Sequence, residues 1–111
     1  MIDQIRPSQL ADWMRRQDTP ALVLDVREPE ELSTASVRPD GFEVRAIPMN
    51  DVPARLAELD PAAPIAVLCH HGARSQRVAQ FLESRGFERV VNIAGGIDAW
   101  TGERDPSVPR Y

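Results

Sequence analysis

Residues 65–78 read IAVLCHHGARSQRV, an apolar run that passes through a polar loop into a second patterned segment. The continuous apolar run from Ile65 to Cys69 is typical of a strand that is buried on both faces of a parallel sheet. Apolar residues then recur at helical spacing, which predicts a helix from Ala73 to Arg85, and Gly86 follows where a left-handed C-terminal cap is favoured. The stretch therefore predicts a strand, a tight loop and a helix, the repeating unit of α/β folds.

Further strands are predicted from apolar runs on either side of this stretch. The run ALVLDV (residues 21–26) has the same continuous apolar character, and RVVNI (residues 89–93) and the shorter RAIPM (residues 45–49) complete the set. A first helix is expected to end near Arg16, and the acidic stretch at residues 27–32 is expected to be a turn into a short helix. A further helix is expected to span residues 51–59, and a last helical turn residues 97–100. Residues 33–45 are expected to be a loop, and residues 101–111 an irregular tail.

The alternation of strands and helices predicts an α/β fold, a small parallel β-sheet flanked by helices on both faces. At 111 residues and 42% hydrophobic content, the chain is long enough for one domain and too short for two. We expect that domain to span residues 1–111, with its core at about residues 5–100. Sites in such sheets gather at the carboxyl ends of strands, which is where Cys69 falls.

Charge and cysteine content narrow the expected partners and location. The net charge of -4 disfavours a nucleic-acid or anionic-membrane surface, because those partners select for a basic face. The first residues lack the features of a secretory signal, and no apolar run is long enough to span a bilayer. The single cysteine permits no internal disulfide, so we expect a reduced thiol in a soluble, cytoplasmic protein.

The loop after the second buried strand holds the chain's one cysteine and both of its histidines, in the order CHHGARS (residues 69–75). If a helix begins near Arg74, this loop must curl so that successive backbone N–H groups point inward, beside the positive end of the helix. Such a nest binds anions and favours a thiolate over a thiol. Gly72 supplies the position that can take a positive φ, and Ala73 keeps the loop narrow. The pattern predicts a nucleophilic Cys69 at the rim of an anion site.

Each of these residues also has a plainer interpretation. Cys69 can pack as a small hydrophobic residue, and His70 and His71 can be solvated loop residues. Adjacent residues on a tight loop rarely converge on one metal ion and the chain has no second cluster, so neither a metal nor a cofactor is expected. Asp25 and Arg27, at the end of the first buried strand, form a structural ion pair more often than a catalytic one.

The sequence CHHGARS resembles the active-site loop of the rhodanese family, single-domain sulfurtransferases whose cysteine carries a persulfide. LDVREPEE (residues 24–31) resembles the family's early Asp-Val-Arg-Glu motif, and GGIDAW (residues 95–100) resembles its closing Gly-Gly and Trp motif. The resemblance covers about residues 5–100. It fails at VRPDGFEVRAIP (residues 37–48), which lacks the Gly-His-Ile-x-Gly-Ala stretch that usually precedes Ile-Pro, so the shape of one pocket wall is not predicted.

The resemblance implies that Cys69 is the persulfide-bearing nucleophile. It implies a donor-binding role for the loop residues His70, His71, Gly72, Ala73, Arg74 and Ser75, with Asp25 and Arg27 supporting them. Cysteine-dependent phosphatases use a related loop with one residue more than the four between Cys69 and Arg74, so by resemblance the shorter loop suits a sulfur-sized group.

The function implied is the transfer of a sulfane sulfur from a small donor anion such as thiosulfate to cyanide, to a thiol or to a protein acceptor. The sequence is also compatible with a second function. The chain can instead be a binding or persulfide-relay module that serves a partner protein without turning over thiosulfate.

Overall fold

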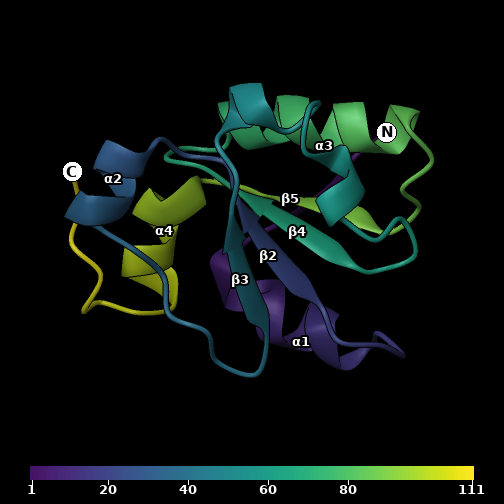
Figure 1. Cartoon of the computed structure of the whole chain (residues 1–111). Helices are drawn as coiled ribbons and strands as arrows, with labels where there is room; N and C mark the ends of the chain where they lie inside the picture. Colours follow the sequence, from purple (N-terminus) through teal and green to yellow (C-terminus); the bar gives the residue numbers. More distant parts are fainter.

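The computed structural model describes the whole chain, Met1 to Tyr111, and is built on one five-stranded sheet (Figure 1). Its strands are β1 (Asp3–Ile5), β2 (Leu22–Asp25), β3 (Glu43–Ala46), β4 (Ile65–Leu68) and β5 (Val90–Ile93). They lie in the order β1-β5-β4-β2-β3, and every neighbouring pair is parallel. The prediction of an α/β fold with a small parallel sheet is confirmed.

Four α-helices and three short 3-10 helices accompany the strands, and the last α-helix follows the final strand. The α-helices are α1 (Leu10–Arg15), α2 (Pro29–Thr34), α3 (Ala73–Ser84) and α4 (Gly96–Glu103), and the 3-10 helices are η1 (Pro7–Gln9), η2 (Met49–Asp51) and η3 (Leu56–Glu58). None of the helices has the length and apolar character needed to cross a membrane.

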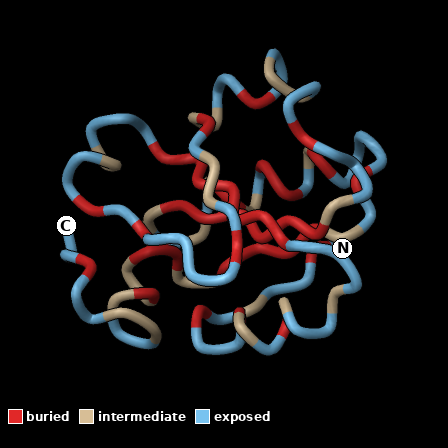
Figure 2. The backbone as a smooth tube through the Cα atoms, turned by 60° about the horizontal axis from the view of Figure 1, so that its bottom comes forward, coloured by how far each residue is buried: buried red, intermediate tan, exposed pale blue.

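The two faces of the sheet are covered by different helices, as expected for this fold. Successive strand residues face opposite sides: Leu22 and Leu24 pack in the cluster that contains the buried face of α3, whereas Val23 packs with residues of α1 and α4. The central strands β2, β4 and β5 are buried along their whole length. Figure 2 shows the buried segments gathered in the middle of the molecule.

Three sequence expectations are corrected by the structure. The expected helix over residues 51–59 is two separate 3-10 turns, because a segment of this length is marginal as an isolated helix and the turns already bury Val52 and Leu59. The expected loop over residues 33–45 ends in β3, an edge strand whose side chains are partly or fully exposed and so produce no apolar run. The expected irregular tail begins inside α4, which continues to Glu103.

The topology places Cys69 at the point in the sheet from which the connections run to opposite sides. From β2 the chain passes through α2 to β3 on one side, and from β4 it passes through α3 to β5 on the other. The carboxyl ends of the adjacent strands β2 and β4 therefore flank a topological switch point, where α/β proteins usually bind ligands. Cys69 directly follows β4 at this point, and α2 and the C-terminal residues lie at the same end of the sheet (Figure 1).

Candidate active site at the ends of the central strands

The Cys69 loop, residues 69–75, holds the sulfur at the start of α3. Cys69 is fully buried, and its Sγ accepts the backbone N–H of Gly72 at 3.0 Å and lies 3.2 Å from the Ser75 hydroxyl. Gly72 has φ +112°, which confirms the expectation of a positive φ at this position. The backbone N–H groups of Ala73, Arg74 and Ser75 open the helix and donate to no group of the chain. The sulfur therefore sits beside the positive end of a three-turn helix.

Gly95 and Gly96, at the start of α4, hold this loop in place from the neighbouring connection. Gly96 has φ +59°, and a Cβ at this position would lie 2.5 Å from the carbonyl oxygen of Cys69, closer than packed atoms allow. Ile97 N–H donates to that carbonyl at 2.8 Å, and Asp98 N–H donates to the carbonyl of His70 at 3.2 Å. The Gly-Gly pair of the GGIDAW motif is the place where α4 contacts the Cys69 loop.

A chain of polar side chains on the far side of the loop fixes Ser75. Its hydroxyl lies 2.5 Å from Asn92 Oδ1, and the amide nitrogen of Asn92 donates to the Gly72 carbonyl at 3.2 Å and to Gln4 Oε1 at 2.8 Å. Asn92 is buried in β5 among apolar neighbours. Sequence reasoning missed Asn92, although a polar residue inside the run RVVNI was a signal that something in the core needed a hydrogen bond.

Asp25 and Arg27 form a buried ion pair beside the loop, at the end of β2. The guanidinium meets both carboxylate oxygens, with Nε 2.9 Å from Oδ1 and Nη2 2.7 Å from Oδ2, and the Arg27 side chain has no exposed surface. Burial acts to lower the pKa of Arg27, but its bonds to Asp25 and to the Tyr111 hydroxyl hold that pKa above its ordinary value. The sheet register pairs Asp25 with Leu68, the residue before Cys69. The hydrogen bonds of the ion pair run to other protein groups, and its expected support of the loop stays a prediction.

Arg74 is joined to α2 by a two-pronged ion pair. Its Nη1 and Nη2 lie 2.6 and 2.8 Å from the two carboxylate oxygens of Glu31, and the Tyr111 hydroxyl donates to the same carboxylate at 2.6 Å. The Arg74 guanidinium holds the pKa of Glu31 well below its usual range, and Glu31 in turn raises the pKa of Arg74. Arg74 therefore has a full partner within the chain, and its expected contact with a donor stays a prediction.

The two histidines differ in their surroundings. The His70 ring is stacked between His71 and Tyr111, with centroids 3.9 Å away on each side, and its Nε2 lies 2.9 Å from the Tyr111 carbonyl oxygen. His71 is exposed, whereas His70 is half-buried. Sequence reasoning missed Tyr111 and Glu31 as neighbours of the loop, because they lie 41 and 43 residues away from the loop residues that they contact.

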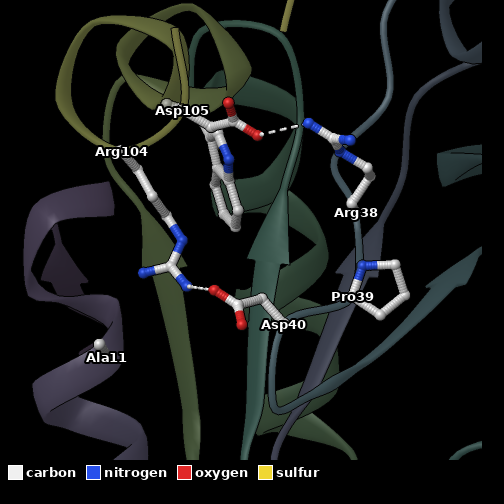
Figure 3. Close-up of a pocket in the computed structure, with 7 residues that line it drawn as sticks. Ala11, Arg38, Pro39, Asp40, Arg104 and Asp105 are labelled. Atoms are coloured by element: carbon white, nitrogen blue, oxygen red, sulfur yellow. Dashed lines mark ion pairs between the residues drawn. The ribbon is translucent and has the colours of Figure 1, made fainter. Parts of the chain in front are cut away.

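The larger cavities of the molecule lie elsewhere. One of about 600 Å³ is lined by residues of α1, of the loop before β3 and of the end of α4 (Figure 3). Its charges are matched within the chain: Arg38 pairs with Asp105 at 3.7 Å, and Arg104 with Asp40 at 3.5 Å. No residue of the Cys69 loop lines this cavity or the four others of note. No three His, Cys, Asp or Glu side chains converge on a point where a metal ion would bind.

Comparison with known proteins agrees with this geometry. The family model for the rhodanese-like domain matches residues 6–103. The chain belongs to the rhodanese-like domain family. A rhodanese-related protein from Thermoplasma volcanium has the same fold, with a TM-score of 0.77, 30% identity and coverage of 98% of this chain and 99% of that one.

Curated relatives of this rhodanese-like domain include proteins named as sulfurtransferases. The sulfurtransferase of Allochromatium vinosum is 32% identical over 97% of this chain and 96% of its own length, and the thiosulfate sulfurtransferase GlpE of Glaesserella parasuis is 32% identical over 93% and 90%. The rhodanese-like/PpiC domain-containing protein 12, chloroplastic, of Arabidopsis thaliana is 42% identical over 82% of this chain, which spans 30% of that protein's length.

Proposed function

We propose that this rhodanese-like domain is a sulfurtransferase that carries a sulfane sulfur on Cys69. The observation that carries the proposal is the position of Sγ, 3.0 Å from the Gly72 N–H at the N-terminus of α3. A thiolate or persulfide at this position receives a hydrogen bond and the favourable field of the helix. The relatives named as sulfurtransferases, and one named as a thiosulfate sulfurtransferase, support the same chemistry.

The proposed cycle has two displacements at sulfur. Once the site opens and the Cys69 thiol has lost its proton to solvent, the thiolate attacks the outer sulfur of thiosulfate. The sulfur–sulfur bond of the donor breaks, and sulfite leaves with the electron pair. An acceptor then attacks the outer sulfur of the persulfide, and the electron pair of that bond returns to Cys69. Cyanide leaves as thiocyanate, and a thiolate leaves as a new persulfide. No net oxidation of the protein occurs, and no metal or cofactor is needed.

The roles of the loop residues follow from their placement. The free N–H groups of Ala73, Arg74 and Ser75 are donors for the oxygens of a small sulfur-donor anion, and Gly72 N–H is a donor for the charged sulfur itself. Asp25 and Arg27 support the loop from β2 without touching the donor. Donors of this kind act best on a group that develops negative charge, which both sulfite and the persulfide do.

A second candidate is a persulfide relay that receives its sulfur from, or delivers it to, a partner protein. The observation in its favour is the burial of Cys69, whose side chain has no exposed surface. A protein partner that rearranges the loop on docking would gain access to this sulfur, whereas a free anion would reach it slowly. The same cysteine and the same persulfide serve in both cases, and only the donor and acceptor differ.

The deciding experiment is intact-mass measurement after incubation with thiosulfate. We expect one added sulfur atom, removed by cyanide with release of thiocyanate, and no addition to Cys69→Ser or to protein alkylated beforehand. Addition without measurable thiocyanate turnover would favour the relay. An unmodified wild-type mass under conditions where iodoacetamide does label Cys69 would contradict the sulfurtransferase proposal.

A further inference from the structure

The C-terminal segment, residues 107–111, folds back across the end of the sheet to the Cys69 loop. Val108 anchors it, with a buried side chain and a carbonyl that accepts the Thr101 hydroxyl at 2.9 Å. At its end the Tyr111 ring stacks on His70 at 3.9 Å between centroids and 9° between planes. The end of the chain stands beside α2 in Figure 1, although the two segments are far apart in the sequence.

The Tyr111 hydroxyl ties three elements together at this place. It accepts a hydrogen bond from Arg27 at 3.0 Å, at the end of β2, and donates one to Glu31 at 2.6 Å, in α2. Glu31 also holds Arg74 of the Cys69 loop. Tyr111 therefore lies in the middle of the residues that surround the loop, and its ring covers His70, the residue next to the cysteine.

Access to the sulfur requires that something move. Cys69 has no exposed surface, and none of the five main cavities reaches it. The first turn of α4 also contacts the loop, but Ile97 and Trp100 fix that helix in the core with 1% and 2% exposure. Tyr111 is 39% exposed, stands at the end of an irregular segment, and is held by polar contacts and one stacked ring. Displacing Tyr111 costs less than displacing α4.

We propose that Tyr111 is a specificity-determining residue that closes the approach to Cys69 and limits by size the molecules that reach its sulfur. Small reagents need only a partial displacement of the ring, whereas bulky ones need the whole side chain to leave its contacts with His70, Glu31 and Arg27. The claim that Tyr111 selects sulfur acceptors rests on the proposed function, but the claim that it covers Cys69 does not.

Alkylation of the single cysteine tests the cover directly. We would measure rate constants for iodoacetamide and for a bulky fluorescein maleimide on wild type, Tyr111→Ala and Tyr111→Phe. Loss of two hydrogen bonds to charged groups shifts the closed–open balance by at least about tenfold, so Tyr111→Ala should react with the maleimide about tenfold faster or more. Iodoacetamide should gain less, and Tyr111→Phe, which keeps the ring but loses the hydroxyl, should lie in between.

Arg110→Ala is the matched control, because its side chain is in the same segment but lies toward Asp98, 3.9 Å away. It should leave both alkylation rates unchanged. A Tyr111→Ala protein that accelerates both reagents equally, or neither, would overturn the proposal. Thermal unfolding of each variant guards against a general loosening, and Tyr111→Phe keeps the test valid if the alanine variant does not fold.

Sulfur transfer then tests selection among acceptors. The ratio of the glutathione rate to the cyanide rate should rise in Tyr111→Ala, since only the larger acceptor is hindered by the ring. An unchanged ratio beside faster maleimide labelling would limit Tyr111 to covering the thiol and refute its role in specificity. Absence of any sulfur transfer in the wild type would contradict the proposed function while leaving the alkylation result intact.

Discussion

The buried pair of Asp25 and Arg27 gives the sharpest test of what supports the Cys69 loop. Replacing Arg27 by Met keeps much of the side-chain volume but leaves the Asp25 carboxylate 1% exposed and without its partner. Breaking a buried ion pair from one side costs about 3–5 kcal/mol, because an uncompensated charge remains in the core. For a chain of this length, that corresponds to a fall of about 12–20 °C in the unfolding midpoint.

Urea unfolding followed by circular dichroism measures this change, with Arg38→Met as the control. Arg38 is 74% exposed beside Asp105, and an exposed pair is worth at most about 1 kcal/mol. In the wild type, Asp25 Oδ1 accepts the backbone N–H of Arg27 at 3.2 Å. Adding Asp25→Asn to Arg27→Met removes the buried charge and keeps an oxygen that can accept this N–H. We expect Arg27→Met to slow sulfur transfer as well as to destabilise the protein. The double variant should recover roughly half of the lost stability, and its rate of sulfur transfer should rise with it.

Two outcomes would refute this reasoning. A loss of less than about 1 kcal/mol in Arg27→Met would mean that the pair is not buried as the structure has it. A double variant that regains its stability but transfers no sulfur would mean that Arg27 contacts the donor, so the plainer reading of this pair as a structural element would be wrong.

Two further predictions concern residues that the loop contacts. Gly96→Ala should destabilise the protein by about 2 kcal/mol or more and slow sulfur transfer, because its Cβ meets the backbone of the Cys69 loop at a positive φ. Gly86→Ala, with a φ of +92° but open space around it, should cost about 1 kcal/mol and leave transfer unchanged. Urea unfolding and thiocyanate release measure both, and equal losses in the two variants would contradict the close approach. The lowered pKa of Glu31 means that its contribution to stability is complete above its ordinary value of 4.5 and is lost as the pH falls below it. The stability gap between wild type and Glu31→Gln should therefore be larger at pH 7 than at pH 3, and a gap that stays constant between these pH values would show that Arg74 does not bind the carboxylate.

The parts of the fold that local pattern determines could be predicted from the sequence. The runs that contain β2, β4 and β5 are apolar throughout because both faces of those strands are covered, and their positions were predicted to within one or two residues. The positive φ at Gly72 and Gly86 followed from the need to turn between elements. β3 was predicted less well: the strand expected at residues 45–49 overlaps it only at Arg45 and Ala46, since an edge strand with polar, partly exposed side chains has little pattern that differs from a loop.

In the site, too, local contacts could be predicted from the sequence and long-range contacts could not. The contact between Sγ and the Gly72 N–H spans three residues, so the motif itself specifies where the sulfur lies relative to the helix. The bonds that hold the loop in place span 17 residues from Ser75 to Asn92, 43 from Arg74 to Glu31 and 80 from Glu31 to Tyr111, and no local pattern encodes such pairs. Two chains with the same loop can therefore share their sulfur chemistry and still differ in how easily the loop opens. In this chain that difference depends on Tyr111, where a single substitution changes the cover over the sulfur without altering any residue of the loop.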